Sequence, residues 1–199
     1  MNLQTHLERT STAFPAVSSG VRNLLVVLAG SAFVAVCAHV TLPLSFTPVP
    51  LTLQPFAVLL LGLVLGPRLA AATLTTYLLE GAAGLPVFAP SNIALTGLAH
   101  LFGPTGGYLL AYPFAVFAIA SLWRSGKRTM GMALISAAVG NLIILSVGAI
   151  WLSILAHESF NTVLSQAVLP FLPGDALKVA AAAALGFGWS SLRPARNRG

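Results

Sequence analysis

The chain has 199 residues, of which 57% are hydrophobic and 7% are charged, and its mean hydropathy is +0.90. Because ordinary globular domains contain about 25% charged residues, this composition excludes a soluble domain with a polar surface and indicates an integral membrane protein. The net charge of +6 does not indicate nucleic-acid binding, since the basic residues form short clusters between apolar runs, with no stacking aromatic residues among them.

Six apolar runs follow a polar N-terminal segment. Residues 1–21 lack the basic-then-apolar order of a signal peptide, so we expect a polar cytoplasmic segment there. A membrane-spanning helix needs about 20 mostly apolar residues. By this measure, and by the Pro, Gly and charged residues that interrupt the chain, the predicted spans are 22–42, 51–66, 68–84, 105–123, 129–156 and 174–192.

Two apolar stretches differ from an ordinary span. The second span is short and begins with the polar sequence LTLQP, so we expect it to enter the membrane at a tilt or beside protein rather than lipid. The stretch 162–174 is too short and too often interrupted by proline to span, and predicts a loop segment or re-entrant turn. The predicted fold class is an all-α integral membrane protein, a six-transmembrane-helix bundle, with a single transmembrane domain over 22–192 and a basic tail over 193–199.

The basic residues predict the orientation of this bundle. With six spans, nine of the ten Lys and Arg residues fall on one side of the membrane, and the opposite loops at 43–50, 85–104 and 157–173 contain none. The positive-inside rule makes the basic side the cytoplasm, which places both termini inside. The remaining basic residue, Lys178, lies near the outer end of the last span.

Asp175 and Lys178 are the most informative charges in the chain. They are three residues apart, so both side chains lie on one helix face within pairing distance. Charges inside a membrane helix are usually paired and functional. Two interpretations remain open: a self-compensating ion pair at the headgroup level, with the lysine reaching outward, or a ligand site in which the ammonium binds a carboxylate and the carboxylate accepts from N–H donors.

Further polar residues map to the same outer zone on this topology: Gln54, Tyr77, Glu80, Asn92 and Tyr108. Glu80 stands beside a glycine near a helix end, where a carboxylate can simply reach water. Asn92 can equally stabilise its loop by an Asx turn. The zone is therefore a candidate ligand site with two weaker members.

Other polar residues predict no additional chemistry. His39 and His100 lack the repeated spacing of a metal site and are interpreted as interface histidines. Cys37 is the only cysteine, which excludes a disulfide framework and a thiolate metal site. In the first span, Ser31, Ala32 and Ala35 are small enough to let another helix approach closely, either within the bundle or from a partner protein.

Three segments of the chain resemble one known family. They are TPVPLTLQPFAVLLLGLVLGPRLAAATLTTYLLEGAAGLPVFA (47–89), LFGPTGGYLLAYPFAVF (101–117) and GDALKVAAAAALG (174–186). Together, in order and spacing, they resemble the BioY family, the biotin-specific substrate-binding (S) components of energy-coupling-factor (ECF) transporters. The resemblance covers most of residues 24–192.

The resemblance implies a six-helix bundle in the bacterial plasma membrane that binds biotin from the extracellular side. It implies that Asp175 and Lys178 contact the ligand, and that the chain works with a transmembrane coupling (T) subunit and two ABC ATPases. The small-residue face of the first span is then the docking surface. The loop after GLPVF reads APSNIALTGLAH here, without the arginine often found in the family. Carboxylate recognition would therefore fall on Lys178, with Asn92 as a substitute donor.

The expected function is thus a biotin-binding transport component with no cofactor, biotin being the transported ligand. The chain has no G-x-x-x-x-G-K-[ST] motif, so a P-loop mechanism of ATP hydrolysis is excluded. We find no nucleophile–base set or metal cluster of an enzyme. We expect Lys178 on the valerate carboxylate, Asp175 on the ureido N–H groups or orienting the lysine, and Gln54, Tyr108 and Asn92 around the rest. The alternatives are an S component for another carboxylate-bearing vitamin, or a structural membrane subunit without a ligand.

Overall fold

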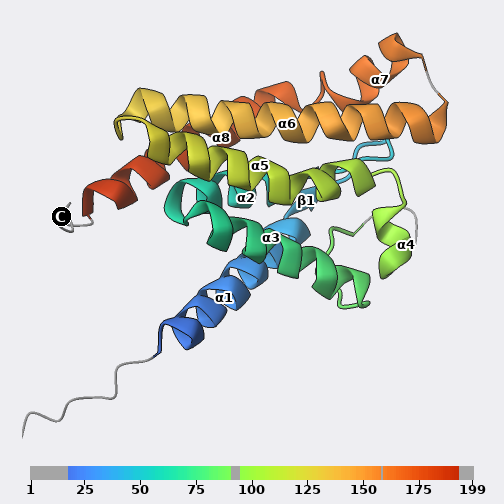
Figure 1. Cartoon of the computed structure of the whole chain (residues 1–199). Coiled ribbons are helices and arrows are strands. Elements are labelled where there is room, and N and C mark those ends of the chain that lie inside the picture. Colours follow the sequence, from blue (N-terminus) through green and yellow to red (C-terminus); the bar gives the residue numbers. More distant parts are fainter. Residues whose placement is uncertain (1–17, 91–94, 158, 193–199) are drawn as a thin grey trace, which may run out of the picture.

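The computed structural model describes residues 18–90, 95–157 and 159–192. Within these ranges the chain forms eight helices and a two-stranded ribbon (Figure 1). In chain order the elements are α1 (Ser19–His39), β1 (Thr41–Leu42), β2 (Leu51–Thr52), α2 (Gln54–Val64), α3 (Pro67–Ala82), α4 (Leu98–Leu101), α5 (Gly106–Ser125), α6 (Met130–Ala156), α7 (Phe160–Ala167) and α8 (Leu172–Leu192). Most of the predicted N-terminal segment and the whole predicted basic tail lie outside the described residues.

The all-α prediction is confirmed, and each predicted span contains one helix: α1, α2, α3, α5, α6 or α8. By length and apolarity, α1, α5 and α6 can each cross a membrane, and α8 together with α7 makes a fourth candidate that is bent by 50°. Helices α2 and α3, with 11 and 16 residues, are shorter than a typical span. The six membrane crossings and the cytoplasmic location of both termini therefore stay predictions.

The structure refines both unusual stretches. Helix α2 contacts α1, α3, α5, α6 and α8, so it lies inside the bundle, as its polar start and short length indicated. The stretch 162–174, expected as a loop segment or re-entrant turn, instead contains most of α7 and the start of α8. Ser159 caps α7, because its hydroxyl accepts a hydrogen bond from the Thr162 N–H.

Small residues let the helices approach one another closely. In Figure 1, α5 and α6 run side by side, and α2 and α3 lie between them and α1. A Cβ at Gly62 of α2 would lie 2.7 Å from a methyl carbon of Ile119, and a Cβ at Gly140 of α6 would overlap the same side chain. Both glycines are therefore required for the packing of α2 and α6 around Ile119 in α5.

The ribbon closes one side of the bundle beside α2. Its strands pair antiparallel, with Thr41 opposite Thr52 and Leu42 opposite Leu51. The Leu53 N–H donates to the Val40 carbonyl oxygen at 3.0 Å, which ties the end of α1 to the start of α2. This connection brings the segment around Thr52 over the interior of the bundle, where the pocket lies.

Candidate ligand-binding site

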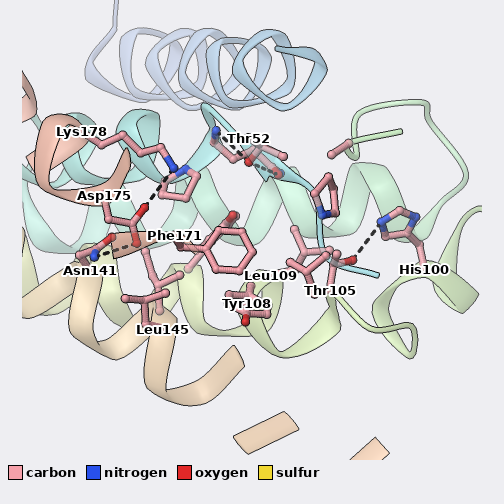
Figure 2. Close-up of a pocket in the computed structure, with 17 residues that line it drawn as sticks. Thr52, His100, Thr105, Tyr108, Leu109, Asn141, Leu145, Phe171, Asp175 and Lys178 are labelled. Carbon is pink, nitrogen blue, oxygen red and sulfur yellow. Dashed lines mark hydrogen bonds and ion pairs between the residues drawn. The ribbon is translucent and has the colours of Figure 1, made fainter. Parts of the chain in front are cut away.

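A pocket lies where α2, α5, α6 and α8 meet the ribbon segment and α4. It contains about 560 Å³ of space not filled by protein atoms, including a part open to solvent. Its walls are mainly apolar, formed by Val49, Pro50, Pro55, Leu109, Ile144, Leu145 and Phe171. Thr52, Gln54, Tyr108 and Tyr112 also line it, and two further groups of polar side chains lie at opposite ends of the wall (Figure 2).

The first polar group, which we call the ion-pair end, consists of Asn141, Asp175 and Lys178. The Lys178 Nζ atom lies 3.0 Å from Asp175 Oδ1, and the Asn141 Nδ2 atom donates to Asp175 Oδ2 at 3.2 Å (Figure 2). Asp175 and Lys178 are only 4% and 9% exposed. A buried ion pair persists only when its geometry is good and further hydrogen bonds satisfy its atoms. Asn141 supplies one such bond from a different helix.

Local structure explains why the ion pair forms. Asp175 stands in the first turn of α8, where the helix dipole favours a negative charge. Lys178 follows one turn later on the same face, as the spacing of three residues predicted. The headgroup interpretation requires exposure of the lysine, whereas both side chains are buried and line the pocket.

The second polar group, which we call the histidine end, consists of His100 and Thr105. The His100 Nδ1 atom lies 3.1 Å from the Leu95 carbonyl oxygen, and its Nε2 atom lies 3.3 Å from Thr105 Oγ1. Because a carbonyl oxygen can only accept, Nδ1 carries the proton in this contact. We interpreted His100 from the sequence as an interface histidine, but it is 6% exposed and part of the pocket wall. Figure 2 shows it on the opposite side of the pocket from Lys178.

Gln54 and Tyr108 line the pocket as predicted, but their polar atoms also hold the surrounding protein. Gln54 Nε2 donates to the Tyr77 hydroxyl oxygen, and that hydroxyl donates to the Val87 carbonyl oxygen at 2.9 Å. The Tyr108 hydroxyl donates to the Ala167 carbonyl oxygen at 2.8 Å. Gln54 and Tyr108 therefore position the chain after α3 and the chain around α7, respectively, as well as forming the wall.

The other two predicted site residues have different outcomes. Glu80 does not line it, because its carboxylate accepts a hydrogen bond from the Ser31 hydroxyl between α3 and α1. The sequence indicated the depth of Glu80 but not the face of α3 on which it lies. Asn92 lies outside the described residues. Of the six residues expected at the ligand, Asp175, Lys178, Gln54 and Tyr108 meet at one pocket.

The predicted docking residues of α1 lie on different faces. Ser31 is fully buried against α3, so it cannot contact a partner in this structure. Ala32 is exposed and Ala35 is partly buried. The corrected small-residue surface of α1 therefore includes Ala32 but not Ser31.

Sequence reasoning missed Asn141 as a site residue. It is the only amide side chain in the 27 residues of α6, and a polar amide in so apolar a helix was a usable signal. Phe171 and Thr105 also line the pocket, but nothing in their sequence context distinguishes them. Among residues 18–90, 95–157 and 159–192, no group of three or more His, Cys, Asp or Glu side chains is arranged to hold a metal ion.

The fold and the pocket define a helical membrane protein suited to hold a small, largely apolar molecule with polar groups at its ends. Comparison with known proteins gives a more specific result, because the model of the BioY family matches residues 7–195. The chain belongs to the BioY family. This match includes all the residues that form the two polar ends of the pocket.

Similar proteins support this membership. The probable biotin transporter BioY of Pyrococcus horikoshii is 44% identical over 138 residues, covering 69% of this chain and 78% of that protein. The biotin transporter BioY of Thermotoga maritima is 36% identical over 163 residues, covering 82% of this chain and 92% of that protein. A crystal structure of the S-component for biotin from an ECF-type ABC transporter is 27% identical, with a TM-score of 0.80, and the match covers 89% of this chain and 96% of that one.

Proposed function

We propose that this chain is the biotin-binding component of an energy-coupling-factor transporter, which captures biotin outside the cell for import. The observation that carries the proposal is the pocket with the buried Asp175–Lys178 pair in a chain whose relatives are named biotin transporters. Biotin has a ureido ring at one end, a carboxylate at the other, and thiolane and aliphatic parts between them. A mainly apolar pocket with polar groups at two separated places matches that distribution.

The residues proposed to bind biotin are Asp175, Lys178, Gln54 and Tyr108, and Asn92 remains part of the proposal from the sequence. Lys178 uses one of its three N–H groups on Asp175, and no other described residue accepts from the remaining two. These donors are directed to a ligand oxygen. The apolar wall encloses the thiolane ring and the aliphatic chain.

The proposed membrane arrangement has six crossing helices within a single domain over 22–192, both termini in the cytoplasm, and the pocket open to the outside of a bacterial plasma membrane. It is supported by the nine Lys and Arg residues that fall on one side of this topology. Short helices such as α2 are compatible with it because α2 is surrounded by protein. Residues 1–21 and 193–199 then lie on the cytoplasmic side.

The proposed partners are a transmembrane coupling subunit and two ABC ATPases, with no nucleic acid and no cofactor. The chain has no P-loop motif, so it does not itself hydrolyse ATP by that mechanism, and the proposal assigns this step to the two ATPases. The exposed Ala32 and partly buried Ala35 of α1 are proposed to form part of the docking surface, where small side chains allow close helix contact. The chain's own role is binding and transport rather than an enzymatic reaction.

Calorimetric titration of the purified protein in detergent tests this function. We expect saturable binding of biotin and weaker binding of desthiobiotin and of other carboxylate-bearing vitamins. Tighter binding of another such vitamin would support the alternative of a different substrate, and no heat with any of them would support a structural subunit. Either result would contradict the proposal.

A further inference from the structure

Asn141 has an unusual position within the pocket. It lies in α6, is 8% exposed, and its side chain belongs to the ion-pair end (Figure 2). Its Nδ2 atom donates to Asp175 Oδ2 at 3.2 Å. Its Oδ1 atom is fully buried and has no hydrogen-bond partner among the described residues. Buried polar atoms in folded proteins almost always have a partner.

The neighbouring carboxylate determines which way this amide points. An ionised carboxylate only accepts hydrogen bonds, so Asp175 requires the NH₂ group of Asn141 on its side. Turning the amide round would place two acceptor oxygens against each other. The other oxygen of Asp175 is already bound to Lys178. Asn141 Oδ1 is thus left as an acceptor at the ion-pair end, without a hydrogen-bond partner among the described residues.

We propose that Asn141 Oδ1 accepts a hydrogen bond from a ureido N–H of the bound ligand, and so selects ligands that present an N–H donor at the ion-pair end. This inference rests on the proposed function, because it concerns the same pocket. Lys178 then donates to the ureido carbonyl oxygen. The ion-pair end provides one acceptor and one donor for the adjacent N–H and C=O groups of a cyclic urea.

Charge favours the same orientation of the ligand. Asp175 and Lys178 already neutralise each other, and both are buried. A ligand carboxylate beside them would leave the buried group with a net negative charge, which low-polarity surroundings disfavour. It would also place a further acceptor near Asn141 Oδ1. A neutral urea avoids both effects, so the valerate carboxylate is directed away from the ion pair, in contrast to our sequence-based assignment of Lys178 to the carboxylate.

The test changes the ligand first. Two lactam analogues of biotin, each with CH₂ in place of one ureido N–H, retain the carbonyl, the thiolane ring and the carboxylate. We expect one of them to bind the wild-type protein about 10- to 100-fold more weakly than biotin, because Asn141 Oδ1 then stays unpaired. If both analogues bind within about threefold of biotin, the inference is wrong.

The protein variant Asn141→Leu completes a double-mutant cycle. Leucine has nearly the same volume and no acceptor, so biotin should bind more weakly while the sensitive lactam loses little further affinity. A discrimination between biotin and that lactam as large as in the wild type would overturn the inference. Ser136→Ala is the matched control, because Ser136 is a buried polar residue of α6 whose hydroxyl bonds the Met132 carbonyl oxygen outside the pocket. It should leave the discrimination unchanged.

The outcomes separate this inference from the proposed function. If the wild-type protein does not bind biotin, the proposed function fails and the inference fails with it. If biotin binds but neither lactam is discriminated, only the role of Asn141 fails. Should Asn141→Leu not fold, the wild-type comparison of biotin with the two lactams still decides, because it requires no variant.

Discussion

The Asp175–Lys178 pair provides a prediction that separates a ligand site from a purely structural ion pair. The pair is replaced one residue at a time, by Asp175→Leu and Lys178→Met, and then in both positions together. Each single change leaves one charge buried without its partner, because the two side chains are only 4% and 9% exposed. Loss of one partner from a buried pair typically costs about 3–5 kcal/mol of stability.

The structure also predicts how the variants differ. Asp175→Leu additionally leaves Asn141 Nδ2 without its acceptor, which adds about 1–3 kcal/mol. The double variant contains no unpaired charge, so only this loss of about 1–3 kcal/mol remains. The two single losses therefore add to far more than the loss in the double variant, which is the signature of a strongly coupled pair.

Chemical denaturation in detergent micelles measures these stabilities, and calorimetric titration of the same samples measures biotin binding. We expect the double variant to be folded, with a loss of stability of only about 1–3 kcal/mol, but without measurable biotin binding. Biotin binding at wild-type affinity in the double variant would refute the assignment of this pair to the ligand. Additive single losses would refute the coupling derived from the 3.0 Å contact.

Three further changes test separate parts of the site. Lys178→Ala should weaken binding of biotin and of its methyl ester by equal factors in calorimetry, because the carboxylate is directed away; a larger loss for the acid would restore the carboxylate assignment. Tyr108→Phe should lower the unfolding free energy by about 1–3 kcal/mol, since the Ala167 carbonyl loses its donor, and should change the biotin Kd by less than about threefold; a larger change in Kd would mean that the hydroxyl contacts the ligand. Glu80→Gln should leave the biotin Kd unchanged in the same titration, because its carboxylate contacts Ser31 outside the pocket; a weakened Kd would return Glu80 to the site.

The helices could be predicted from sequence because a long apolar run in lipid has to satisfy its own backbone hydrogen bonds. The pairing of Asp175 with Lys178 could be predicted for a related reason, since residues three apart on a helix share one face. Both predictions depend only on local geometry. The same limit explains why the break between α7 and α8 was expected only as a loop segment or turn, although most of that stretch is helical.

Other parts of the site depend on how distant segments pack, which no local pattern contains. Asn141 and Asp175 are 34 residues apart in sequence, and they meet only because α6 packs against α8. The face of α3 that carries Glu80 is set by its contact with α1 rather than by its own sequence. His100 lies in α4 and lines the pocket, and its ring packs beside the ring of Phe88, twelve residues earlier, at a centroid distance of 4.9 Å.

The hydrogen bonds around the pocket explain how its wall is held in place. Gln54 in α2 is linked through Tyr77 in α3 to the backbone at Val87, and Tyr108 in α5 is linked to the backbone at the end of α7. Wall residues from two helices thus position two connecting segments beside the ligand pocket. A molecule that shifts α2 or α5 on binding would shift these segments with it, because buried hydrogen bonds of this kind are costly to leave unmade.

A structure of the protein crystallised with biotin tests the central claim most directly. The account predicts that biotin occupies the pocket with its ureido ring at the ion-pair end, an N–H within hydrogen-bond distance of Asn141 Oδ1, and the carbonyl oxygen beside Lys178 Nζ. Biotin bound elsewhere, or a bound molecule that leaves Asp175 and Lys178 without contact, would contradict it.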